Sequence, residues 1–156
     1  MPNHLGGYIP MWLLLCMTLL FSPNQAIPQL TVTQPIAGAA QVELFDTDKE
    51  RVVERFDNSA SFQAVAQSLL NSVNGRVMEI NPSLSRAMIV KIPLAPPKKL
   101  IHKPSGINTT ISDVYVIMSR ERPRPYMILR TTENEILLVE FAEETAELKK
   151  LVHLTP

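Results

Sequence analysis

The segment that most constrains the fold is residues 59–74, where apolar side chains recur at intervals of three and four. This spacing places them on one face of a helix, and they are Phe62, Val65, Ala66, Leu69, Leu70 and Val73. Asn58 or Ser59 is expected to cap the start of this helix, and Gly75 to end it. An apolar face of this width has to be buried, and only the strand-like segments on either side are long enough to cover it. The helix therefore predicts a sheet.

Composition limits the chain to one domain and argues against several classes of protein. After an N-terminal quarter of unusual composition, the rest suffices for one domain of roughly 110 residues with its own core. The formal net charge is zero, which argues against a dedicated nucleic-acid binder, since such domains are normally basic throughout. Cys16 is the single cysteine, so the chain has neither an intramolecular disulfide nor a cysteine-based zinc site.

The N-terminus has the composition of an export segment. Residues 1–41 contain no Asp, Glu, Lys or Arg, and residues 8–21 form an apolar run of fourteen residues. That length suits a signal peptide better than a membrane span, which needs about 20 apolar residues. We expect residues 1–26 to be a signal peptide; because positive charge before the run is sparse and the cleavage site is poor, a short uncleaved membrane anchor stays an alternative. Residues 27–40 are expected to be a spacer, and both alternatives place the domain outside the cytoplasm.

Residues 41–156 are predicted to form a single domain built from short strands and two helices. The expected strands are residues 41–45, 50–56, 76–80, 87–92, 111–119, 126–131 and 135–141, with turns at residues 46–49, 81–83 and 120–125. A short helix is expected over residues 142–152, because its acidic start and basic end suit the helix dipole.

Prolines divide this pattern in the middle of the domain. Pro93 is expected to end its strand, and Pro96, Pro97 and Pro104 to keep residues 94–110 an irregular loop. The predicted fold is α+β, with an antiparallel sheet, one main amphipathic helix packed on a face and a short C-terminal helix.

Several short sequences in the second half of the chain resemble a known group of proteins. They are IPLAPP at residues 92–97, DVYVI at residues 113–117, PY at residues 125–126 and ENE at residues 133–135. In these the chain is similar to small exported domains of unknown function in spore-forming Gram-positive bacteria. The resemblance implies a location outside the cytoplasm and brings no known activity or ligand with it.

No group of residues predicts a catalytic, metal or cofactor site. His102 and His153 have no metal-ligating residue at the required spacing on the same element, and His4 lies in the export segment. The five glycines are too dispersed for a phosphate-binding loop. The carboxylates Glu133, Glu135, Glu140, Glu143, Glu144 and Glu147 occupy turn, strand and helix-start positions, where such groups are usually solvated. We therefore expect no enzyme and no cofactor.

Positive charge is concentrated between residues 86 and 130. If the proline-rich loop packs beside the turn at residues 120–125, the fold presents a basic patch able to hold phosphate-rich polymers, anionic headgroups or an acidic protein surface. The residues of this patch are Lys98, Lys99, Lys103, Arg120, Arg122 and Arg124. The alternative is a scatter of solvated loop charges.

These observations predict a non-enzymatic, exported or membrane-tethered binding domain of the cell envelope. Its partner is expected to be an envelope protein or an anionic polymer, with membrane contact only through the N-terminal segment and no nucleic acid involved. The alternative is an inhibitor or regulator of an extracellular enzyme that acts through the proline-rich loop of residues 94–108, since a stiff loop loses little entropy on docking.

Overall fold

A computed structural model of the chain describes residues 40–79, 82, 84–122 and 124–154. The predicted signal peptide or anchor, Cys16 and the spacer up to residue 39 lie outside the described residues, as do residues 81 and 83 of one predicted turn. The described residues belong almost entirely to the predicted globular domain.

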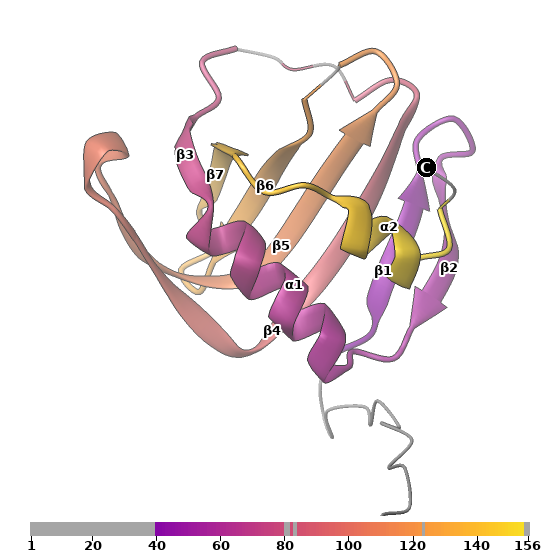
Figure 1. Cartoon of the computed structure of the whole chain (residues 1–156), viewed down its shortest axis with the longest axis horizontal. Coiled ribbons are helices and arrows are strands. Elements are labelled where there is room, and N and C mark those ends of the chain that lie inside the picture. Colours follow the sequence, from indigo (N-terminus) through magenta and orange to yellow (C-terminus); the bar gives the residue numbers. More distant parts are fainter. Residues whose placement is uncertain (1–39, 80–81, 83, 123, 155–156) are drawn as a thin grey trace, which may run out of the picture. The chain divides into compact units, whose positions relative to one another are not determined.

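The described chain forms one seven-stranded sheet in the order β2-β1-β4-β5-β6-β7-β3, with neighbouring strands antiparallel (Figure 1). The strands are β1 (Val42–Asp46), β2 (Arg51–Phe56), β3 (Val73–Arg76), β4 (Ala87–His102), β5 (Ile107–Ser119), β6 (Tyr126–Thr131) and β7 (Ile136–Phe141). The helices are α1 (Ala60–Asn71) and α2 (Ala146–Leu151), and a 3-10 turn, η2 (Lys103–Ser105), joins β4 to β5. The predicted α+β class with an antiparallel sheet is confirmed.

Both predicted hairpins are present, and turn side chains that bond nearby backbone close each of them. Between β1 and β2, Asp46 Oδ1 accepts a hydrogen bond from the amide of Asp48 at 3.0 Å. Between β6 and β7, the hydroxyl of Thr131 accepts bonds from the amides of Glu133 and Glu135 at 3.2 and 3.0 Å. The sequence predicts this chemistry for the first hairpin, because it is local, but not the role of Thr131 at the end of β6.

α1 ends earlier than predicted, and the chain enters a strand almost at once. Ser72 lies at the end of the helix, and Val73 already pairs with Phe141 of β7. Gly75 therefore lies within β3 and does not cap the helix. The strand predicted over residues 76–80 is misplaced, because β3 spans Val73–Arg76 and shares only Arg76 with it. Pairing with β7 supplies a long-range partner for this backbone, and that tertiary contact outweighs the local helical periodicity.

Buried side chains of the helices and of the sheet belong to one apolar cluster. From α1 they are Phe62, Ala66, Leu69 and Leu70, from α2 Leu148, and from the central strands Val90, Ile92, Val114, Val116, Met127 and Leu129. A smaller cluster consists of Ala87, Ile117 and Tyr126. These three alternate with the first set along the same strands, so they lie on the opposite face of the sheet.

The prolines do not end β4, contrary to the prediction. β4 continues past them and pairs with β5 on both sides of an interruption between Pro93 and Lys98. Residues 94–110, predicted as an irregular loop, therefore form the far half of a long hairpin, with η2 at its turn. We call residues 98–111 the arm; it is the salmon ribbon that extends beyond the sheet on the left of Figure 1.

Side chains at the start of α1 bond the backbone at this interruption. The Pro93 carbonyl accepts hydrogen bonds from Nδ2 of Asn58 and Nε2 of Gln63, both at 2.8 Å. Gln63 Oε1 accepts a bond from the amide of Ala95 at 3.1 Å, and its Nε2 also donates to Asn58 Oδ1 at 2.7 Å. Because buried backbone groups need partners, these bonds stabilise the bend of β4 by satisfying the Pro93 carbonyl and the Ala95 amide. We call Asn58, Gln63 and the Pro93 carbonyl the proline clamp; Ser59, at the N-cap position, makes no side-chain capping bond.

The C-terminal helix is shorter than predicted, because α2 begins at Ala146 and not at residue 142. The amide of Ala142 donates to the carbonyl of Ser72 at 3.0 Å, which ties the segment before α2 to the end of α1. The expected charge arrangement is present, with an acidic first turn and lysines in the last turn.

Replacing Gln63 by alanine is expected to destabilise the domain. The Gln63→Ala variant loses three hydrogen bonds and leaves the Ala95 amide without its partner. We expect the free energy of unfolding to fall by about 1–3 kcal/mol. The control is Gln67→Ala on the same helix, where the lost bond is an exposed one to Asn71, and its effect should stay within about 0.5 kcal/mol. Urea denaturation measures the free energy of unfolding of both variants. An equal decrease in the two would show that the proline clamp does not stabilise the bend of β4.

Candidate functional site

The six basic residues of the predicted patch fall into two separate groups. Lys98, Lys99 and Lys103, which we call the arm lysines, lie on the arm, and Arg120, Arg122 and Arg124, the turn arginines, follow the other end of β5. Lys98 is opposite Ile111, and the turn arginines follow Ser119, eight residues further along β5. At the rise of an extended strand this is about 25 Å. The single patch predicted from a folded-back loop is therefore not formed, because pairing with β5 carries the arm away from the turn.

Arg122 is held by its neighbours in the fold. Its guanidinium pairs with Glu79 and Glu140 at 2.8 and 3.4 Å and lies 5.0 Å from the centre of the Tyr126 ring. Burial raises the pKa of the Tyr126 hydroxyl, and the charge of Arg122 partly opposes this; the hydroxyl is buried without a hydrogen-bond partner among the described atoms. Arg122 therefore serves packing at this end of the sheet, while the other two turn arginines are exposed.

The arm lysines are unpaired. None of them makes an ion pair or a side-chain hydrogen bond with another residue that the structure describes. No Asp or Glu occurs from residue 80 to residue 112, so these cations have no acidic neighbour on the arm. Between them, the side chain of Ile101 is 59% exposed. The arm combines free positive charge with an exposed apolar side chain.

A groove of about 500 Å³ lies between the arm and the end of α1. Its walls are Leu70, Asn71 and Val73 on one side and Lys99, Leu100, Ile101 and His102 of β4 on the other. The tip of the arm is tied to β3, because Arg76 Nε donates to the carbonyl of Ser105 at 3.0 Å. The His102 ring shares a hydrogen bond of 2.9 Å with the Ser105 hydroxyl. We call this cavity the arm groove.

β4 has an unpaired backbone edge beside this groove. β1 pairs with β4 only from Met88 to Lys91, and the proline clamp covers the bend that follows. From Lys98 to His102, β4 pairs with β5 on one edge, and no strand in the described part of the chain pairs with the other. Four consecutive residues of β4 and none of β5 line the groove, which favours a position along the unpaired side. Sequence reasoning missed this edge, although lysines and prolines together are typical of an edge strand.

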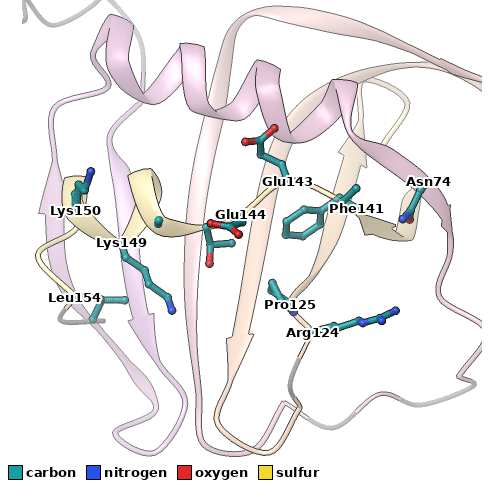
Figure 2. Close-up of a pocket in the computed structure, with 12 residues that line it drawn as sticks. Asn74, Arg124, Pro125, Phe141, Glu143, Glu144, Lys149, Lys150 and Leu154 are labelled. Carbon is teal, nitrogen blue, oxygen red and sulfur yellow. The ribbon is translucent and has the colours of Figure 1, made fainter.

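A second cavity of about 790 Å³ opens beside α2 (Figure 2). Its walls come from α2, the segment after β7 and the residues before β6, and Phe141, Pro125 and Leu154 supply apolar surface. In Figure 2, Lys149 extends from α2 toward Pro125, whereas the guanidinium of Arg124 points away from α2. The two cations do not converge, so this cavity does not define the charge of a ligand. Its walls are far apart in the sequence, and no sequence pattern predicted it.

The described residues show no arrangement that points to metal chemistry. No group of three or more His, Cys, Asp or Glu side chains among them is placed to hold a metal ion. The histidines of the domain lie apart, His102 beside Ser105 and His153 at 3.4 Å from Glu54. That the chain is not an enzyme and binds no cofactor stays a prediction. Among the same residues, no helix combines the length and apolar character needed to cross a membrane.

No family model, no curated protein and no solved structure matches the chain. The resemblance to small exported domains stays a prediction. The geometry of the arm and its groove is therefore the basis for inferring function.

Proposed function

We propose that the chain is a non-enzymatic binding domain of the cell envelope, exported or membrane-tethered, and that the arm lysines contact an anionic partner. The observation that carries the proposal is the arm itself, on which three unpaired lysines occupy a stretch without acidic residues. Because the whole chain has zero net charge, the positive potential is local to the arm. A local potential orients the approach of a negatively charged partner.

The proposal assigns α1 the role of an amphipathic helix packed on one face of the sheet. In support, its buried residues Phe62, Ala66, Leu69 and Leu70 share one apolar cluster with residues of β4, β5 and β6. Burial of each large apolar side chain contributes about 1.5–3 kcal/mol. Leu70 also lines the arm groove, so the packing that holds the helix positions one wall of the groove.

Export is supported by the apolar run of residues 8–21 and by the uncharged first 41 residues. The N-terminal residue and the cell fraction of the protein recovered from its own cells test this location. A start near Ile27 in the medium is expected for a secreted domain, and an intact Met1 in the membrane fraction for a tethered one. An intact chain recovered from the cytosol would contradict both.

Charge reversal of the arm is expected to weaken the electrostatic part of envelope binding. The arm variant carries Lys98→Glu, Lys99→Glu and Lys103→Glu, and the control variant carries the same charge change beside α2, as Arg124→Glu, Lys149→Glu and Lys150→Glu. The measurement is cosedimentation of full-length protein with isolated envelopes over a salt series, since salt weakens exposed ionic contacts and leaves membrane insertion largely unaffected.

We expect the salt-sensitive binding of the arm variant to be weaker by about tenfold or more, and that of the control variant to be close to wild type. If the arm variant binds as the wild type does, the arm lysines are not the contact and the proposal fails.

A second candidate function is inhibition or regulation of an extracellular enzyme through residues 94–108. The exposed side chain of Ile101, at 59%, favours it, because an apolar residue on an ordered arm can enter a partner's pocket at low entropic cost. In that case Ile101 and not the lysines would carry the binding energy. The arm variant and the control variant would then bind envelopes alike.

A further inference from the structure

We propose that the arm groove accepts an extended acidic peptide, which adds as a strand to the unpaired edge of β4. This inference rests on the proposed function, in which the arm contacts an anionic partner, and it names the chemistry of that partner. Three features coincide at the groove: an unpaired backbone edge, an apolar opposite wall and unpaired lysines.

The backbone edge is the first feature. From Lys98 to His102, β4 is bonded to β5 along one edge, and the described chain supplies no strand for the other. An extended segment can pair with such an edge through its own amide and carbonyl groups. Pro96 and Pro97 lack the N–H group that this pairing needs, but both precede Lys98, so they leave this part of the edge uninterrupted.

The opposite wall is the second feature. Leu70 and Val73, at the end of α1 and the start of β3, and Leu100 on β4 belong to the buried apolar cluster, and at 2%, 7% and 6% exposure each presents only a small surface to the groove. Successive side chains of a strand point to opposite faces. An added strand would therefore direct every second side chain toward this apolar surface. Side chains such as those of valine or threonine suit these positions, because they are compact and favour extended backbone.

The arm lysines are the third feature and determine the charge of the peptide. Lys99 lines the groove itself, and Lys98 and Lys103 lie just before and just after its β4 wall. No carboxylate occurs on the arm to neutralise them. Along β4, Lys99 lies on the face opposite that of Leu100, whereas Lys98 shares the Leu100 face. Asp or Glu at the positions that alternate with the apolar ones would complement Lys99, so the matching sequence alternates acidic and apolar residues.

A peptide fits these features better than an anionic membrane surface does. A bilayer would also attract the arm lysines, but it cannot pair with the backbone of β4 or fill a groove between the arm and α1. Binding to lipid is therefore treated as a competing outcome of the experiment.

The test starts from the full-length protein and a display library of random short peptides. Enrichment of sequences with Asp or Glu at alternate positions is expected. Enrichment of sequences without this pattern, or no enrichment at all, would overturn the proposal.

The enriched peptide is then synthesised in two versions, each N-methylated at alternate residues. Because alternate amides of a strand face the same edge, one version should lose about tenfold or more in affinity and the other about twofold or less. Equal affinities would exclude strand addition.

Charge is tested on the protein with conservative variants. The Lys98→Gln, Lys99→Gln and Lys103→Gln triple variant should bind the peptide about tenfold or more weakly, whereas the matched triple variant Arg124→Gln, Lys149→Gln and Lys150→Gln should bind as the wild type does. Equal affinity of the two triple variants would contradict the role of the arm lysines. If the protein binds vesicles of anionic phospholipid through these lysines but binds no peptide, the peptide proposal is wrong. The proposed function, in which the arm lysines contact an anionic partner, would then still hold. Envelope binding that does not depend on the arm lysines would instead refute the proposed function itself.

Discussion

The arm depends on the hydrogen bonds that Asn58 and Gln63 make with the backbone of Pro93 and Ala95. A proline-rich segment ordinarily ends a strand, because each proline removes a donor and fixes its own backbone angle. Here two side-chain amides from the start of α1 satisfy the carbonyl and the amide at the bend, so β4 can resume its pairing with β5 at Lys98. Side-chain amides thus replace strand partners at the bend, and the hairpin continues where the prolines would otherwise end the strand.

The hairpin creates the features on which the functional argument rests. It carries the arm lysines away from the turn arginines, and it brings one face of the arm against Leu70 and Val73. It also leaves β4 without a strand partner on the edge that borders the arm groove. The arm lysines are unpaired because no acidic residue occurs on the arm, whereas Arg122 at the other end of β5 pairs with two glutamates and lies against an aromatic ring. Basic side chains therefore have two roles, according to the neighbours that the fold provides.

The parts of the fold that follow from local chemistry could be predicted from the sequence. These are the two hairpins, the turn chemistry of the first one and the interior strand β5. The passage of β4 through the prolines could not, because the partners of Pro93 lie 35 and 30 residues earlier in the chain. The end of α1 was misplaced for a similar reason, since Val73 pairs with Phe141. The basic residues were selected by their charge, but their separation in the fold depends on strand register, which the sequence alone does not reveal.

Amide hydrogen exchange over residues 98–111 tests the central claim most directly, because it asks whether the arm is a paired hairpin. The account predicts slow exchange for the alternate amides that face across the hairpin between β4 and β5, and faster exchange for the β4 amides on the unpaired edge. Uniformly fast exchange along the whole segment, at the rate of an unstructured chain, would contradict it. In that case neither the arm groove nor the unpaired edge of β4 would exist as a binding surface.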